Sequence, residues 1–386
     1  MTKPVGVVAA LLVASAFVSG QPRPASSGLV VHEWGTFTSI AGEDGRAVEW
    51  LPQAGPTDLP GFVGRINCSL KGSLTGTIRM ETPVIYFYAP REMTVRASVT
   101  FPQGVITEWF PRPAGTTDDI INRAFRGEIA WPDVKVRPGV SANFPNDRDN
   151  NHYYVARHTD AAPLEVGGQA ERFLFYRGVG RTQPPLNARV MPNGQIVVQH
   201  TRGEALGDII LFENRDGSTA YAAQHTSAPR AAFNALEPEG EGLSPQLQLE
   251  KILIAHGLYS KEAKAMIESW RGSWFEQGTR LFYIVSGDAV NNVLPLQIDP
   301  QPIEVTRVFV GRLEITTAAT LREVKTAVQM KDRAKLAQYG RFLQPISRQL
   351  LASVAAEERW DLKRRLEGAY QAWVAPTTCR EASPPR

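Results

Sequence analysis

The chain has 386 residues, with 42 lysines and arginines against 39 aspartates and glutamates and a formal net charge of +3. Its length suggests two or three domains with sizeable cores. Nucleic-acid binding depends on a concentrated basic surface, and nothing in so balanced a composition indicates one. We therefore expect no nucleic-acid partner.

Residues 1–20 have the composition of a secretory signal peptide. Lys3 gives a positive start, residues 5–17 are apolar and uncharged, and small residues end the segment. No later stretch reaches the ~18 apolar residues of a membrane span. We therefore expect an exported protein, periplasmic or extracellular, whose mature chain begins with a flexible leader at residues 21–28 and contains no transmembrane segment.

The chain contains two cysteines, Cys68 and Cys379. An exported protein meets oxidising conditions, in which a pair of cysteines can form a disulfide bridge. Such a bridge would tether the C-terminal tail to the β region. The sequence leaves open whether the two form a bridge or remain free thiols.

Residues 29–228 have the pattern of strands joined by short turns. Residues 84–88 are apolar at both parities, which predicts a strand covered on both faces. Residues 94–101 alternate between apolar and polar, which predicts a strand with one wet face. A Pro-Gln-Gly turn follows, and residues 105–110 are expected to return as the second strand of a hairpin.

Two further hairpins are predicted around Asn193-Gly194 and Asp216-Gly217, since these dipeptides between apolar runs are strong hairpin signals. No helical pattern separates the strands of this region, which favours an antiparallel sheet. We predict a mainly β protein with a large antiparallel β-sandwich at residues 29–228. Other strand candidates begin at residue 29 and cover residues 129–136, 153–155 and 172–176.

The pattern changes after residue 228 to a mixed α/β, helix-rich C-terminal region. Residues 229–316 contain a helix pair that begins at Ser244-Pro245 and at Ser260. Two strands, at 281–285 and 305–315, either rejoin the sheet or form a small one of their own. Residues 317–375 are predicted to form two C-terminal helices broken at Tyr339-Gly340, followed by a tail at 376–386.

Four runs resemble stretches in a set of exported bacterial proteins with an HEWGTFTS-type N-terminal motif and no known activity. The runs are VHEWGTFTSIAGEDG, RMETPVIYFY, RFLFYRGVG and RVFVGRLEIT. The resemblance implies export and bacterial origin, and it carries over no catalytic residue.

Residues 147–160 contain the first candidate site, a metal-binding loop. The candidate ligands are Asp147, Asp149, Asn151, His152, His158 and Asp160. The first three place oxygen donors at alternate positions, which suits Ca²⁺, whereas the two histidines with an aspartate would suit Zn²⁺. The loop departs from the EF-hand pattern because histidines occupy its glycine and final glutamate positions. The alternative is a solvated loop whose polar side chains make turns.

A second candidate site combines His32, Glu33 and Glu81 as catalytic residues. If the two glutamates faced each other ~5 to 9 Å apart across a cleft, they would match the acid and base of a glycosidase. The alternative is structural: His32 would bind a backbone carbonyl, and Glu81 would pair with Arg79 or Arg96. Two carboxylates on different strands are weak evidence for catalysis.

Aromatic residues at strand spacing offer a third possibility, a carbohydrate-binding face, although such residues more often belong to the core. The set is Tyr86, Tyr88, Trp109, Phe110, Trp131, Tyr153 and Tyr154.

The HExxH, GxSxG, Walker and GxGxxG motifs do not occur in the sequence. We therefore expect a non-catalytic binding or scaffolding protein whose partner is a cell-envelope glycan or protein. The alternative is a secreted hydrolase of glycans or peptides, either with or without the assistance of a metal ion.

Overall fold

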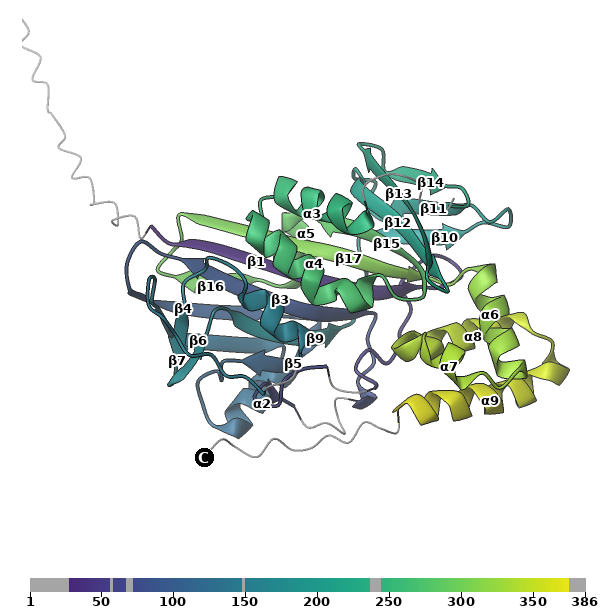
Figure 1. Ribbon diagram of the computed structural model, residues 1–386, viewed down its shortest axis with the longest axis horizontal. Coiled ribbons are helices and arrows are strands. Elements are labelled where there is room, and N and C mark those ends of the chain that lie inside the picture. The colour runs from purple at the N-terminus through teal and green to yellow at the C-terminus, as the bar shows by residue number, and fades with distance from the viewer. Residues whose placement is uncertain (1–27, 56–57, 67–71, 148–149, 237–243, 375–386) are drawn as a thin grey trace, which may run out of the picture.

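A computed structural model describes residues 28–55, 58–66, 72–147, 150–236 and 244–374 (Figure 1). The described chain is mainly β, with large multi-stranded sheets. The expected signal peptide, nearly all of the leader and both cysteines lie outside the described residues, as does the predicted tail from residue 376 onward.

The largest sheet has nine strands and takes strands from both ends of the chain. Its order is β13 (Ser218–Thr226), β12 (Gly207–Arg215), β15 (Gly278–Val285), β17 (Glu304–Ile315), β1 (Val30–Ala41), β3 (Ile78–Tyr88), β9 (Leu174–Gly180), β5 (Gly104–Phe110) and β2 (Gly64–Arg65). β1 pairs with β17 in parallel, and the other neighbours are antiparallel. Of the two arrangements left open for the late strands, they adopt the first and rejoin the main sheet.

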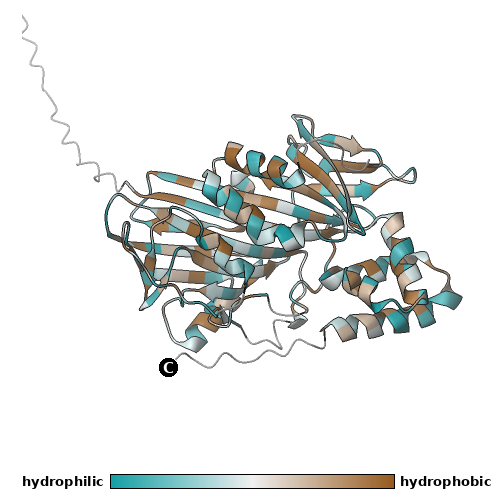
Figure 2. Ribbon diagram, viewed as in Figure 1, coloured by the Kyte–Doolittle hydropathy of each residue, from teal (hydrophilic) through white to brown (hydrophobic). Residues whose placement is uncertain are grey.

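Strand β3, near the centre of the main sheet, is covered on both faces, as predicted for residues 84–88. Ile85 and Phe87 belong to one hydrophobic cluster, whereas Val84 and Tyr86 belong to another on the opposite face. Successive side chains of a strand point to opposite faces, so a strand that is apolar at both parities is stable only between two packed layers. Figure 2 shows apolar residues recurring along the strands of this sheet.

A five-stranded sheet contributes to the same cluster as Ile85. It consists of β16 (Leu296–Asp299), β4 (Met93–Thr100), β6 (Glu128–Val136), β7 (Leu164–Val166) and β8 (Gln169–Glu171). The hairpin expected between residues 94–101 and 105–110 is wrong, because β4 pairs with β6 and β16 while β5 pairs with β9 and β2. The turn is present, with the Gly104 N–H donating to the Phe101 carbonyl over 3.0 Å.

That turn carries the chain from one sheet to the other. Val95, Val99 and Ile106 all enter the same core, and Phe101 is fully buried at the corner between them. Strands on opposite sides of one core bury more apolar area than neighbours in a single sheet, which outweighs the local preference for a hairpin.

The other two hairpins are confirmed. β12 pairs with β13 across Asp216-Gly217, and both turn residues have positive φ, as a two-residue hairpin turn requires. β10 (Leu186–Val190) pairs with β11 (Ile196–His200), and β14 (Arg230–Phe233) completes a three-stranded sheet.

Helices α3 (Pro245–Ala255) and α4 (Ser260–Trp274) cross the other face of the main sheet (Figure 1). Ser244 caps α3 as predicted, whereas α4 begins after Tyr259 and its capping carboxylate comes from Glu262. Residues 153–155, expected as a strand, lie in the 3₁₀ helix η1 (His152–Arg157), which begins at the Asn151 cap. Two short helices, α2 (Thr117–Phe125) and α5 (Gly287–Val293), complete this part of the chain.

The C-terminal helices are shorter than the two expected. They are α6 (Ala318–Gln329), α7 (Arg333–Ala337), η2 (Gly340–Phe342), α8 (Leu343–Ser353) and α9 (Ala356–Val374). Lys331, at positive φ, ends the first segment. These helices bury a cluster of their own that includes Trp50 and Ile40. None of the helices in the described part of the chain combines the length and apolar composition needed to cross a membrane.

Candidate functional site

Glu33 and Glu81, the predicted acid and base, are both buried but have different partners. Glu33 accepts hydrogen bonds from Arg307 Nε over 2.6 Å and from the Tyr176 hydroxyl over 2.5 Å. Glu81 accepts a hydrogen bond from Arg341 Nη2 over 2.8 Å. Each carboxylate is thus held in its own ion pair.

The two glutamates also lie on opposite faces of the main sheet. Glu33 is one residue from Trp34, which belongs to the helix-covered face, so Glu33 points into the core between the sheets. Glu81 pairs in register with Thr36, two residues beyond Trp34 and therefore on the helix-covered face. The structure does not bring Glu33 and Glu81 together, and they cannot act on one bound substrate.

His32 lies on the helix-covered face but apart from Glu81. Its Nδ1 is 2.8 Å from a carboxylate oxygen of Glu262, the residue that caps α4. The other oxygen of Glu262 accepts a hydrogen bond from the Tyr88 hydroxyl over 2.8 Å. This buried cluster joins α4 to the sheet, and the expected backbone carbonyl is replaced by a carboxylate.

The candidate metal ligands are dispersed. Asp147 accepts the Gly61 N–H over 2.5 Å, and Asn151 accepts the Tyr153 N–H as the cap of η1. Asp160 pairs with Lys261 over 2.5 Å. His152 points into the protein, whereas His158 is exposed to solvent. Asp149 lies outside the described residues. Among the residues that the structure describes, no three His, Cys, Asp or Glu side chains gather as metal ligands.

The aromatic set is mostly core. Tyr86, Trp109, Phe110, Trp131 and Tyr153 are each at most 5% exposed, which leaves them no face for a sugar. Tyr88 and Tyr154 are partly buried.

Glu81 and His152 do meet at one place, a group of buried charges where the C-terminal helices approach the sheet. Arg177 donates to Asp58 over 2.6 Å, and His152 Nε2 lies 4.0 Å from the same carboxylate. Burial raises the pKa of Asp58, but Arg177 and Arg79 outweigh this and hold that pKa well below its usual value. Burial lowers the pKa of His152.

Sequence reasoning named Arg79 only as an alternative partner of Glu81, which pairs instead with Arg341, and it missed the other arginines of this group. Arg79 and Arg177 stand in otherwise apolar runs on β3 and β9, and Arg312 stands likewise on β17. A charged residue inside a strand that is apolar on both faces must be buried, and a buried arginine requires a carboxylate partner. That signal is present in RMETPVIYFY and RFLFYRGVG, two of the four runs behind the resemblance to exported bacterial proteins.

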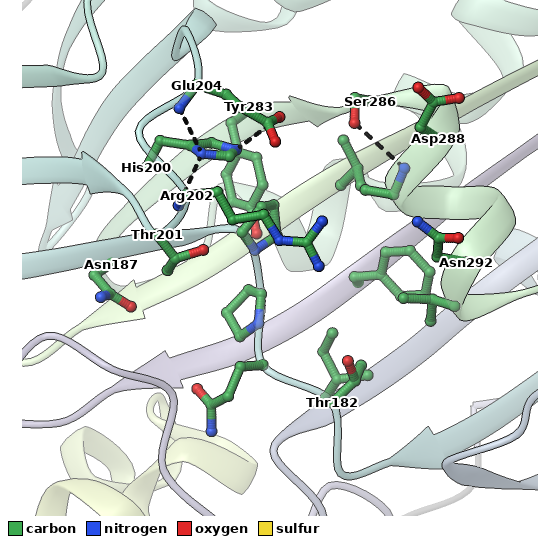
Figure 3. Close-up of a pocket in the computed structure, with 18 of the residues that line it drawn as sticks. Thr182, Asn187, His200, Thr201, Arg202, Glu204, Tyr283, Ser286, Asp288 and Asn292 are labelled. Carbon is green, nitrogen blue, oxygen red and sulfur yellow. Dashed lines mark hydrogen bonds and ion pairs between the residues drawn. The ribbon is translucent and has the colours of Figure 1, made fainter.

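A cavity of about 1220 Å³ opens elsewhere (Figure 3). We call it the amide-lined cleft. It lies between the end of β15 with α5 on one side and residues 182–187 and 199–204 on the other. Its rim carries side-chain amides, hydroxyls and charged groups from Gln103, Thr182, Gln183, Asn187, Gln199, Thr201, Arg202, Glu204, Ser286, Asp288, Asn291 and Asn292.

The floor of the amide-lined cleft is apolar. Phe37, Phe101 and Tyr283 contribute buried rings, and Phe37 stacks on Phe309 at 5.0 Å between ring centroids. Tyr283 lies over Gly311, its cross-strand partner, where a Cβ would come within 2.0 Å of the phenol ring. The floor is therefore fixed by the sheet beneath it.

His200 lies at the edge of this cleft, and both nitrogens of its ring have partners. Its Nδ1 accepts backbone N–H hydrogen bonds from Arg202 and Glu204, over 3.3 and 3.1 Å. An Nδ1 that accepts two hydrogen bonds carries no proton, so the ring hydrogen is on Nε2. Nε2 lies 3.6 Å from the Glu204 carboxylate. Figure 3 shows these contacts as dashed lines.

No family model matches the sequence, and no curated protein matches it. Among solved structures, the yeast delta-COP-I mu-homology domain is similar at a TM-score of 0.27 and 9% identity, over 76% of this chain and 100% of that one. The same domain in complex with a Dsl1 WxWxV peptide gives 0.28 and 9%, with the same coverage. TM-scores this low show no shared fold, and the likeness carries no argument.

Proposed function

We propose that this is an exported, non-catalytic binding protein of the bacterial cell envelope, and that the amide-lined cleft takes a segment of envelope glycan. The nine- and five-stranded sheets would act as one β-sandwich that supports the cleft, with the helix-rich C-terminal region packed beside it. The composition of residues 1–20 supports export. The single observation that carries the binding role is the cleft, with its apolar floor and its amide and hydroxyl rim.

The size of the cleft favours an extended ligand. At about 1220 Å³ it exceeds the ~300–1,000 Å³ typical of small-molecule pockets. Sugar rings present apolar faces and many hydroxyls that both donate and accept hydrogen bonds. Side-chain amides such as those of Asn187 and Asn292 do the same, which makes them suitable partners for an uncharged glycan.

The geometry of His200 argues against a role for its Nδ1 as a general base in the cleft. A general base needs a free lone pair within reach of the substrate. The Nδ1 lone pair of His200 is already used by the N–H groups of Arg202 and Glu204. His200 therefore orders the 200–204 turn at the rim of the cleft.

Isothermal titration calorimetry with β-1,4-linked N-acetylglucosamine oligomers, together with sedimentation with purified bacterial cell walls, tests the proposal. The wild-type protein is expected to bind both, and Asn292→Ala and Arg202→Ala to weaken binding several-fold, since both residues lie exposed on the rim.

Lys251→Ala is the matched control because Lys251 is exposed on α3, outside the cleft. Binding that is absent in the wild type, or equal in the rim and control variants, would contradict the proposal. Release of new reducing ends from the cell walls would instead support the alternative glycan hydrolase.

A further inference from the structure

A second cavity lies on the opposite face of the main sheet, where the C-terminal helices meet it. We call it the arginine cavity. Its volume is about 340 Å³, within the range that small-molecule ligands occupy. Its walls come from Gln53, Ala54 and Asp58, from β3, η1, α4 and the segment 339–342, and one edge is closed by Trp373 of α9. That ring packs on Gly55, where a Cβ would come within 2.3 Å of it.

Arg79 is the buried arginine with the weakest partner around this cavity. Its neighbours Arg177, Arg312 and Arg341 each donate to a carboxylate oxygen at 2.8 Å or less. Within the described part of the chain, Arg79 forms an ion pair only with Asp58, over 3.8 Å, which is beyond hydrogen-bond distance. Its side chain is 6% exposed, and its Nε has no hydrogen-bond partner among the described residues.

Arg79 therefore has no carboxylate within hydrogen-bond distance among the residues that the structure describes. Burial and the neighbouring Arg341 guanidinium lower the pKa of Arg79 to about 10, although Glu81 and Asp58 act in the opposite direction. A buried guanidinium normally has each N–H bonded to a carboxylate, carbonyl or water. Arg341, also at the cavity wall, has an unpartnered Nε of its own. Both arginines line the same cavity.

The other walls indicate the rest of the ligand. Trp270, Tyr339, Phe342 and Trp373 contribute aromatic rings to the cavity. An organic ligand with a flat apolar body would pack against them, while its acid group met the arginines.

We propose that the arginine cavity binds a small organic acid with a single carboxylate and an aromatic or apolar body. A single ligand carboxylate would supply Arg79 with the direct partner that Asp58, at 3.8 Å, does not provide. A phosphate dianion would place a second charge near Asp58, Glu81 and Glu276, which line or adjoin the cavity, and is disfavoured for that reason. This site is independent of the proposed function of the amide-lined cleft.

Calorimetry and thermal unfolding with three probes at matched ionic strength test this proposal. Benzoate is expected to bind and to raise the melting temperature. Benzamide, which has the same ring without the charge, and inorganic phosphate, which has charge without a ring, are expected to bind at least tenfold more weakly. No benzoate binding at millimolar concentration, or equal binding of benzamide or phosphate, would overturn the proposal.

Variants then assign the site. Arg79→Gln and Arg341→Gln are expected to weaken benzoate binding at least tenfold. Arg348→Gln is the matched control, since Arg348 is exposed on α8 and lies outside the cavity. Should loss of Arg79 prevent folding, Ala54→Phe retains every charge and fills the space from the wall at residue 54, and it must also abolish binding.

Two further results complete the test. Benzoate binding that survives both Arg341→Gln and Ala54→Phe would refute the site. Asn292→Ala, on the rim of the amide-lined cleft, is expected to leave benzoate binding unchanged. Failure of one proposal is therefore distinguishable from failure of the other.

Discussion

Nδ1 of His32 lies 2.8 Å from a carboxylate oxygen of Glu262, and both side chains are fully buried. The contact joins the first strand of the main sheet to the first turn of α4, across 230 residues of sequence. The same carboxylate accepts the Tyr259 N–H and the Tyr88 hydroxyl, each over 2.8 Å. One side chain thus fixes a helix end, a strand and an aromatic pair.

Glu262→Ala is therefore expected to lower the free energy of unfolding by about 3 kcal/mol or more, since it leaves several buried donors unpaired. Glu262→Gln keeps an acceptor oxygen and should lose less. Urea denaturation measures both values. Replacement of exposed Glu250, on α3, serves as the control. Equal stability of Glu262→Ala and wild type would show that the cluster does not hold α4 to the sheet.

Acid should destabilise the protein through Glu81. Burial raises the pKa of this carboxyl, but Arg341 and Arg79 outweigh burial and lower it to about 2. A folded-state pKa below the unfolded value means that the unfolded chain binds more protons, so stability falls as the pH decreases from about 4.5 to about 2. The loss attributable to Glu81 is on the order of 3 kcal/mol.

The melting temperature measured from pH 6 down to pH 3 checks this expectation. The double variant Glu81→Gln/Arg341→Gln removes both the acid and its partner and should show a shallower fall. A parallel decline in the two proteins would assign the acid sensitivity to other carboxyls. Asp58, whose pKa is also held well below its usual value by Arg177 and Arg79, would then be the next carboxyl to replace.

Gly311→Ala is expected to destabilise the protein by roughly 2 kcal/mol or more, because the new Cβ would meet the ring of Tyr283 at 2.0 Å. Tyr283 also forms part of the floor of the amide-lined cleft. The variant should therefore bind N-acetylglucosamine oligomers more weakly under conditions where it remains folded. Gly272→Ala on α4, where a Cβ would meet nothing within 4 Å, is the control. Unchanged stability and binding would contradict the fixed position of the ring.

Gly217→Val should lower the free energy of unfolding by roughly 1–2 kcal/mol, since Gly217 has a φ of +85° in the turn between β12 and β13. Asp216→Asn, at the preceding turn position, suits the same conformation and should be nearly neutral. Thermal unfolding compares the two. If Gly217→Val is as stable as Asp216→Asn, the turn does not require a positive φ at residue 217.

Local sequence signals predicted the elements of this fold better than their partners. The Asp216-Gly217 and Asn193-Gly194 turns lie where the dipeptides indicate, because φ preferences act within two residues. The turn at residues 101–104 was also found, but its two strands enter different sheets. A turn fixes only where the chain reverses, whereas the burial of Phe101 and Ile106 decides which strand becomes the neighbour.

The candidate sites depend still more on distant contacts. The sequence suggests Glu33 and Glu81 as an acid and base because both lie in or next to apolar strands. In the structure, the bulges near Trp34 and Thr82 shift the register of β1 and β3, so the two carboxylates lie on opposite faces of the sheet. Arg341, which binds Glu81 from 260 residues away, gives no local sign of that contact. The amide-lined cleft is built from segments that meet only in three dimensions, and its polar rim resembles any exposed loop when viewed one residue at a time.

The parallel pairing of Val30–Ala41 with Glu304–Ile315 places two segments far apart in the sequence side by side at the centre of the main sheet. While the protein is being made, β1 has no partner on that side until more than two hundred later residues have emerged. Closing so large a loop is slow, because the chain loses conformational entropy before the packing contacts that stabilise the pairing can form. A nascent chain of this topology would stay loose for most of its synthesis. If the protein is exported as proposed, such a delay would keep the chain unfolded for passage through a translocation pore.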